Sequence, residues 1–366
     1  MNSLESIGFY TLSDSRVANV SMSSPMWRCE LILTDLCNFK CPYCRGIDEP
    51  HARGLTWDEA SFVVKMWASQ GLKNIRFSGG EPTMWKGYES FEDGTNVRRD
   101  LSDLVSLSKE LGIEHIAIST NGSVNTKVYK KLINCGVNDF SISLDACCAE
   151  TGDRMAGEKK GAWQRVVDNI REISKLTYVT VGVVFTQENV NEFQEIVRFA
   201  SEDLKVADIR ILSSAQWNAG LADVRIDSAF LDKHPILKYR MANFASSRHV
   251  RGLKGTDSKQ CPLMLDDMAV LDGFHFPCII YLREQGAPVG KIDTSLSPLK
   301  AMQKAREERR QWIARTNTHD DPICKKNCLD VCIDYNNRAT ELNAGLENII
   351  HPVESRKIIP ILAICD

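Results

Sequence analysis

The stretch LTDLCNFKCPYCRG, residues 33–46, places three cysteines on one short loop directly after an apolar, strand-like segment. Cys37, Cys41 and Cys44 are separated by three and then by two residues. Three thiolates at this spacing can bind three irons of a [4Fe-4S] cube and leave the fourth iron open to a small molecule. Zinc is the alternative, but a structural zinc site needs four ligands, and His51 is the one further candidate nearby in the sequence. The loop therefore predicts a cluster with a free coordination position.

Composition and charge describe an ordinary globular protein. The chain has 366 residues, 43% of them hydrophobic, which is enough for a large catalytic domain and a smaller second one. A formal charge of -3 argues against non-specific polyanion binding. The first residues show no secretory signal, and no apolar run is long enough to span a membrane. We therefore expect a cytoplasmic protein whose 13 cysteines are mostly reduced and serve metal binding or catalysis.

Short β-branched runs alternate with amphipathic helical segments between about residues 28 and 215. This is the pattern of repeated βα units around a parallel sheet. A capping box at Thr56 and Glu59 opens the first helix, and Gly71 closes it. The six expected strands are 29–33, 74–78, 115–119, 140–144, 179–185 and 209–212. Six units predict an α/β fold, a partial (β/α)6 barrel whose ligands bind at the carboxyl ends of the strands.

Four segments follow from this pattern. Residues 1–27 are an N-terminal extension and residues 28–215 the barrel core. Residues 216–260 are a connection with one helix near 230–246, and residues 261–366 form a small cysteine-rich domain with a C-terminal tail.

Tyr43 stands directly before the last cysteine of the loop. With this aromatic residue the chain resembles the radical S-adenosylmethionine (SAM) superfamily, whose members carry a CxxxCxxC loop after the first strand. The resemblance implies that SAM chelates the open iron through its amino and carboxylate groups. Reduction of the cluster then cleaves SAM to a 5′-deoxyadenosyl radical that abstracts hydrogen from the substrate. It also implies a reductant such as flavodoxin or ferredoxin.

Motifs after the next three strands support the resemblance. Gly79, Gly80, Glu81 and Pro82 resemble the GGEP motif that holds the methionine amino group, although paired glycines also serve turns. The run IleSerThrAsnGly, 118–122, resembles the STNG segment, in which Ser119 and Asn121 would reach the ribose. The resemblance thus predicts one SAM site built from successive βα loops.

The fourth strand and the segment after it add two further candidates. Ser143 and Asp145 belong to a run that resembles the SLD motif, which implies that Asp145 points into the active site. Arg154 lies where the superfamily pairs an arginine with the SAM carboxylate, a task that suits a planar guanidinium. Without that context, Arg154 reads as a solvated surface charge.

A second cysteine group follows residue 260. Cys261 and Cys278 flank Gly273 in a predicted hairpin that resembles the opening of SPASM and twitch domains. The candidate ligands further along are Cys324, Cys328 and Cys332, with Cys365 in the tail. Five cysteines are enough for one auxiliary [4Fe-4S] cluster of four ligands, so we expect a twitch-like domain with one cluster. A structural zinc site is the alternative.

Cys147 and Cys148 directly follow the run SerLeuAspAla, 143–146. A thiol can return a hydrogen atom to a substrate radical, so both join Asp145 as candidate catalytic residues. The alternative is that they are small buried hydrophobic residues.

Three substrate classes remain open. A small polar metabolite such as a sugar or cyclitol, oxidised or epimerised, suits a single auxiliary cluster. A peptide is the second, although about 27 residues before the first strand are too few for a leader-binding domain. A nucleotide or nucleic acid is the third, for which basic residues of one loop and one helix would form a phosphate-binding stripe, although charged helices are usually only solvated. These residues are Arg248, His249, Arg251, Lys254, Lys259, Lys304, Arg306, Arg309, Arg310 and Arg315. A non-enzymatic iron–sulfur electron carrier would not need the GGEP and STNG loops.

Overall fold

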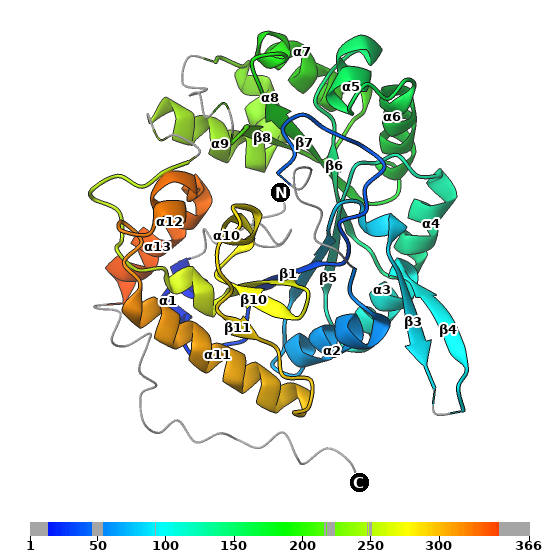
Figure 1. Cartoon of the computed structure of the whole chain (residues 1–366). Coiled ribbons are helices and arrows are strands. Elements are labelled where there is room, and N and C mark those ends of the chain that lie inside the picture. The colour runs from blue at the N-terminus through cyan, green and yellow to red at the C-terminus, as the bar shows by residue number, and fades with distance from the viewer. Residues whose placement is uncertain are drawn as a thin grey trace.

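One mixed sheet organises the molecule. The computed structural model describes residues 14–45, 54–91, 93–215, 217, 224–246, 248 and 251–343 (Figure 1). In this part of the chain nine strands form a sheet of order β11-β10-β9-β1-β2-β5-β6-β7-β8, parallel from β9 to β8. The six strands of the barrel are β1 (Arg28–Ile32), β2 (Asn74–Ser78), β5 (His115–Thr120), β6 (Asp139–Ser143), β7 (Tyr178–Phe185) and β8 (Asp208–Ser213). All six expected strands are thus confirmed, and the sheet is open.

Helices between the strands cover the outer face of the sheet (Figure 1). They are α2 (Trp57–Ala68), α3 (Leu101–Glu110), α4 (Thr126–Cys135), α5 (Ala149–Met155), α6 (Ala162–Ile173) and α7 (Phe193–Arg198), with the short α1 (Asp14–Asn19) before the first strand. Thr56 caps α2 by accepting from the Glu59 amide at 3.2 Å, which confirms the capping box. Gly71 has a φ of 78°, the left-handed conformation that lets the chain turn towards β2. No helix of the described residues is long and apolar enough to cross a membrane.

The connection after β8 contains two helices instead of the expected one. They are α8 (Ser228–Lys233) and α9 (Pro235–Ala245). Pro235 lacks an amide hydrogen and fits the first turn of a helix. Helix α8 therefore ends before His234, and α9 begins at Pro235. Asp208, at the start of β8, stabilises the first turn of α9, because its carboxylate accepts from the Ile236 amide at 3.0 Å.

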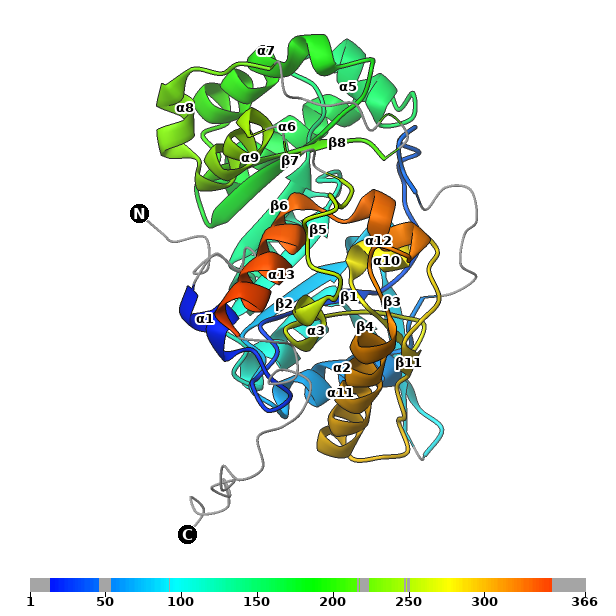
Figure 2. The same ribbon diagram turned by 90° about the vertical axis from the view of Figure 1, so that its left-hand side faces the viewer.

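The cysteine-rich segment is joined to the barrel through the same sheet. Strand β9 (Asp267–Leu271) pairs parallel with β1 and antiparallel with β10 (Phe274–Phe276), which confirms the hairpin around Gly273. The remaining elements are α10 (Ile279–Arg283), β11 (Gly290–Lys291), α11 (Pro298–Arg315), α12 (Pro322–Asn327) and α13 (Asp330–Leu342). In Figure 2, α10, α12 and α13 lie on the open side of the sheet. Ile280 of α10 and Val331 of α13 line the same cavity as Ser141 of β6.

A protruding hairpin interrupts the βα pattern after β2. Strands β3 (Lys86–Ser90) and β4 (Asn96–Asp100) form a separate two-stranded sheet that extends away from the body (Figure 1). Both strands are largely exposed and lack the alternation of apolar and polar residues that predicts a strand. The sequence pattern therefore did not indicate them.

Two arginines of the basic stripe expected for nucleic acid are buried inside the fold. Arg306 is buried and donates to the carbonyl oxygens of Ser21 and Met22. Arg309 is also buried, and its guanidinium donates to the carbonyl oxygens of Met264 and of residues in and beside β10. These two arginines donate to backbone carbonyls inside the fold and do not face a ligand. Other members of the same stripe are exposed, namely Lys254, Lys259, Lys304 and Arg315.

Candidate active site

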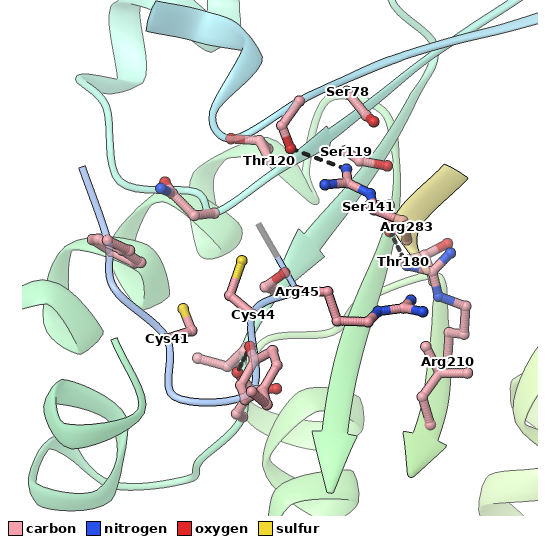
Figure 3. Close-up of a pocket in the computed structure, with 18 of the residues that line it drawn as sticks. Cys41, Cys44, Arg45, Ser78, Ser119, Thr120, Ser141, Thr180, Arg210 and Arg283 are labelled. Atoms are coloured by element: carbon pink, nitrogen blue, oxygen red, sulfur yellow. Dashed lines mark hydrogen bonds between the residues drawn. The ribbon is translucent and has the colours of Figure 1, made fainter. Parts of the chain in front are cut away.

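A cavity of about 370 Å³ runs along the inner face of the sheet, beginning at the cysteine loop (Figure 3). Cys37, Cys41 and Cys44 all line it, as do residues from every strand of the barrel. Cavities of this size are typical of small-molecule sites. The structure therefore brings the predicted cluster ligands into contact with the space in which a substrate would lie.

The cysteine loop folds tightly, with the Cys44 amide donating to the Cys41 carbonyl at 2.9 Å. Burial raises the pKa of Cys41 to about 12 and also raises the pKa of Cys37. Bare thiols in this environment stay protonated, whereas a bound cation reverses that preference. Within the described residues no three His, Cys, Asp or Glu side chains are arranged to hold a single metal ion. Three soft sulfur donors on one cavity wall suit an iron–sulfur cluster.

Gly79 and Gly80 line the cavity and also hold the cysteine loop in place. A Cβ on Gly80 would lie 2.4 Å from the Asp35 carbonyl oxygen, and one on Gly79 would lie 2.4 Å from that of Thr34. The Gly80 amide donates to the Thr34 carbonyl at 2.6 Å. Only glycine allows the backbone after β2 to approach the chain before Cys37 this closely.

Glu81 and Pro82 lie outside the cavity lining, unlike their two glycine neighbours. The Glu81 carboxylate is fully buried and accepts from Thr83, from the Thr120 hydroxyl at 2.8 Å and from the Asn121 amide at 2.8 Å. Burial raises its pKa, and these hydrogen bonds oppose the rise. Glu81 therefore ties two βα loops together and is not free to accept directly from a ligand, in contrast to the role expected for it.

Ser119, Asn121 and Ser143 line the cavity as predicted. The Asn121 side-chain amide donates to the Asn38 side chain at 2.8 Å and contacts the Cys37 sulfur at 3.7 Å. The loop after β5 thus touches the cysteine loop directly. Ser119 accepts from Arg76 at 2.9 Å, so its hydroxyl already belongs to the polar network of the barrel.

Tyr43 and Asp145 meet at the wall of the cavity. The Tyr43 hydroxyl donates to the Asp145 carboxylate, whose other oxygen accepts from the Val184 amide at 2.7 Å. Burial raises the pKa of Asp145 to about 6, although both hydrogen bonds favour the ionised form. Asp145 therefore faces the site as expected, and it joins the cysteine loop to β7.

Three predicted residues lie away from the cavity. Arg154 is half-exposed and pairs with Glu188 at 3.0 Å. Cys147 contacts the Glu192 carboxylate at 3.6 Å, and Cys148 contacts the Thr151 hydroxyl at 3.5 Å. The side chains expected to hold the SAM carboxylate and to donate hydrogen thus contact other partners. Those of Arg154 and Cys147 come from the segment after β7, and that of Cys148 comes from α5.

The second cysteine group gathers around a separate small pocket. All five predicted ligands line it, namely Cys261, Cys278, Cys324, Cys328 and Cys332. Burial raises the pKa of Cys261 to about 12, and Asn336 donates to its sulfur at 3.2 Å. Cys365 lies outside the described residues. The pocket thus gathers five thiols, one more than a four-ligand cluster needs.

Sequence reasoning missed the arginines that line the cavity. Six of them do so, namely Arg28, Arg45, Arg76, Arg210, Arg240 and Arg283. Four pair with carboxylates: Arg28 with Glu30, Arg45 with Glu284, Arg76 with Asp139 and Arg240 with Asp330. Three of them, Arg28, Arg76 and Arg210, lie in strands of the sheet. An arginine in such a strand was a signal of a polar site that the sequence offered, because the interior of such a barrel is usually filled by branched apolar residues.

Arg210 and Arg283 differ from the other four. Among the described residues neither forms an ion pair, and each makes one hydrogen bond, to Ser141 at 2.9 Å and to the Gly79 carbonyl at 3.1 Å respectively. Burial, together with the nearby Arg76, lowers the pKa of Arg210 to about 9. Figure 3 shows Arg45, Arg210 and Arg283 on one side of the cavity and Cys41 and Cys44 on the other. The site is therefore polarised, with thiols at one end and excess positive charge at the other.

Residues 31–200 match the Radical SAM superfamily, so the chain carries a radical SAM domain and the resemblance seen in the sequence is confirmed. Among curated relatives, "Molybdenum cofactor biosynthesis protein 1" of Drosophila melanogaster is 29% identical over 51% of this chain and 32% of its own length. The "Probable GTP 3',8-cyclase" of Sulfurisphaera tokodaii is 28% identical over 46% of this chain and 50% of its own. The "GTP 3',8-cyclase" of Staphylococcus aureus is 36% identical over 34% and 36%. The chain thus matches half or less of the length of these three relatives.

Solved structures share the fold at low identity. SuiB from Streptococcus suis, bound to S-adenosylmethionine, aligns with a TM-score of 0.53 at 15% identity, covering 82% of this chain and 65% of SuiB. The protein anSMEcpe with bound AdoMet aligns with a TM-score of 0.53 at 16% identity, covering 87% of this chain and 93% of its own. Both alignments extend well beyond residues 31–200, so the likeness of fold includes part of the cysteine-rich segment.

Proposed function

We propose that the radical SAM domain of this chain abstracts a hydrogen atom from an anionic small molecule of the nucleotide class, bound in the cavity beside Cys37, Cys41 and Cys44. The [4Fe-4S] cluster and SAM, when bound, supply the reductive cleavage and the radical chemistry of the superfamily. The protein binds both partners, orients them and excludes water. The observation that carries the substrate class is the pair Arg210 and Arg283.

These two arginines require a negative partner. Both interact electrostatically with Glu30, but the Glu30 carboxylate is paired with Arg28. A buried guanidinium without an ion pair of its own is costly, so this cavity is suited to an anion. Arg210 lies beside the hydroxyls of Ser141 and Thr180 on the same wall (Figure 3). Guanidinium and hydroxyl donors together match the oxygens of a phosphate. A neutral sugar or cyclitol offers no such group, so an anionic substrate replaces it as the leading candidate.

The relatives favour a nucleotide among anionic substrates. The names of two of them state that they act on GTP. A peptide remains the second candidate, because SuiB has been seen bound to its precursor peptide in the same fold. The excess of buried arginine over acid favours the nucleotide, since a peptide backbone is neutral.

The test is substrate-dependent SAM cleavage. Reconstituted protein with dithionite is given nucleoside triphosphates, nucleoside monophosphates, the parent nucleosides or neutral sugars, and 5′-deoxyadenosine release is measured. We expect stimulation that requires phosphate. Arg210→Gln should raise the apparent KM by roughly 30-fold or more, because losing one partner of a buried charge pair costs about 2–5 kcal/mol. Arg98→Gln, on the exposed strand β4, is the matched control. Equal stimulation by nucleosides and their phosphates would refute the anionic substrate.

The five clustered cysteines support a proposed auxiliary [4Fe-4S] cluster in the second pocket. Iron analysis after anaerobic purification should give about eight irons per chain for two cubes. About four irons and one zinc would instead assign the second pocket to structural zinc.

A further inference from the structure

Asn336 of α13 lies buried at the second cysteine pocket. It is 5% exposed and lines the pocket together with the five cysteines. Its side-chain oxygen accepts from the Leu263 amide at 3.0 Å, and its side-chain nitrogen donates to the Cys261 sulfur at 3.2 Å. A backbone amide can only donate, so the contact with Leu263 determines which end of the Asn336 side chain faces the sulfur. Asn336 is therefore held as a hydrogen-bond donor to a predicted cluster ligand.

A second N–H donor and a positive charge act on the same part of the pocket. The Tyr281 amide donates to the Cys278 sulfur at 3.4 Å. The buried Arg309 interacts electrostatically with both Cys261 and Cys278. Burial raises the pKa of Cys261 to about 12, whereas Asn336 and Arg309 oppose this rise. Hydrogen bonds and charge at these two cysteines thus favour the thiolate, which is the form that binds iron.

Two other cysteines of the pocket face acceptors instead. The Cys328 sulfur lies 3.9 Å from the Leu329 carbonyl oxygen. Burial raises the pKa of Cys324, as does a hydrogen bond to the Asp321 carboxylate. An acceptor beside a sulfur stabilises the protonated thiol and opposes negative charge there. The donors at Cys261 and Cys278 are therefore the groups that can stabilise negative charge on a bound cluster.

We propose that Asn336 raises the reduction potential of the auxiliary [4Fe-4S] cluster by donating to the Cys261 thiolate. The inference rests on the cluster proposed above for this pocket. Reduction by one electron makes the cluster more negative, and a hydrogen bond to one of its sulfur ligands becomes stronger with that charge. The electron comes from the reductant that SAM cleavage already requires, no iron–sulfur bond breaks, and no proton moves. Because Leu263 holds the Asn336 side chain, the donor need not reorient when the electron arrives.

The test is a redox titration of the reconstituted full chain, followed by electron paramagnetic resonance. SAM binds the first cluster, so the signal that SAM leaves unchanged belongs to the second. Asn336→Leu removes the donor at similar volume. We expect the equilibrium constant for reduction of the second cluster to fall about tenfold, which lowers its potential by about 59 mV for one electron.

Asn337→Leu is the matched control, because it makes the same change one position along α13. Asn337 lines the same pocket, but its side chain accepts from the Ser258 amide at 2.8 Å and donates to the Asp257 carboxylate at 3.1 Å. Its variant should keep the potential of the parent. Equal potentials in Asn336→Leu and Asn337→Leu would overturn the inference.

Iron content separates this inference from the proposed cluster. A parent with about eight irons contains both clusters, and an unchanged potential in its Asn336→Leu variant then refutes the role of Asn336 alone. A parent with about four irons and one zinc would refute the auxiliary cluster, and the inference with it.

A measurement on the parent covers the case in which Asn336→Leu fails to bind the second cluster. Asparagine is isotopically labelled at its side-chain nitrogen, and pulsed electron paramagnetic resonance is recorded on the reduced second cluster. We expect a nitrogen coupling that changes with the label and persists in Asn337→Leu. The lack of any such coupling would overturn the inference.

Discussion

A buried acid, Asp208, contributes to the pH dependence of the free energy of unfolding. Asp208, at the start of β8, is fully buried and accepts from the amides of Ile209 and Ile236 and from the Tyr178 hydroxyl. Burial raises its pKa to about 6, and these hydrogen bonds limit the rise. The folded chain therefore binds the Asp208 proton more tightly than the unfolded chain does, and the group stabilises the fold most at low pH.

We expect this contribution to be complete below about pH 4 and to be lost as pH rises through about 6, by about 3 kcal/mol in total. The measurement is the free energy of unfolding in urea for the parent and for Asp208→Asn between pH 4 and 7. The difference between the two should fall with rising pH and then stay constant. Other acids cancel in this difference because both proteins contain them. A difference that does not change with pH would show that Asp208 keeps an ordinary pKa.

At the scale of elements, the loop after β2 supports the cysteine loop through backbone contact. Gly80→Ala should displace the cysteine loop, because its Cβ would lie 2.4 Å from the Asp35 carbonyl oxygen. We expect loss of most iron from the first cluster and a stability loss of about 1–3 kcal/mol. Gly255→Ala is the control, since a Cβ there meets no atom within 4 Å. Iron content and the urea midpoint are the readouts, and parent-like iron binding in Gly80→Ala would contradict the predicted contact.

The short helix α10 connects the two cysteine centres. The Cys278 sulfur caps its start by accepting from the Tyr281 amide at 3.4 Å, and Arg283 at its end reaches the Gly79 carbonyl. Ile280 lines both pockets. Cys278→Ala removes this capping acceptor and should therefore weaken SAM binding about tenfold, roughly the value of one lost hydrogen bond to the glycine loop.

Equilibrium dialysis of SAM, with protein matched for iron in the first cluster, measures this effect. Arg283→Lys should reproduce it, because lysine lacks the planar fork that reaches Gly79. Parent-like SAM affinity in both variants would show that α10 transmits nothing between the centres.

The elements were largely predictable, whereas the partners of individual side chains were not. Strands such as β2 follow from local runs of apolar residues, and the Thr56 capping box marks a helix start on its own. The position of β9 beside β1 depends on pairing over more than two hundred residues, which no local pattern encodes. Glu81 and Arg154 sit in the expected motifs, but their hydrogen-bond partners come from other βα loops and appear only in the folded chain.

At the scale of the whole molecule, the barrel and the cysteine-rich segment share one sheet, and part of the segment packs in the core of the barrel. Other residues of the segment, such as Trp312 and Tyr335, pack in a second cluster. Met268 and Val270 of β9 and Met302 of α11 pack in the same cluster of buried side chains as Leu31 of β1. The expected boundary near residue 260 is therefore a boundary in composition, and the two parts are joined by a strand pair in the middle of the sheet. We therefore expect the two parts to unfold together.

We expect one cooperative unfolding transition, in which loss of the barrel and exposure of the second cysteine group coincide. Met268→Ala tests this, because Met268 is fully buried and its sulfur accepts from the Trp67 indole at 3.2 Å. It should lower the free energy of unfolding by about 2–5 kcal/mol. In metal-free protein, circular dichroism and thiol labelling of Cys324 and Cys328 should shift to lower urea by equal amounts. Leu299→Ala, at a half-exposed position of α11, should leave both unchanged. Labelling that precedes the loss of circular dichroism would show that the cysteine-rich segment unfolds as an independent domain.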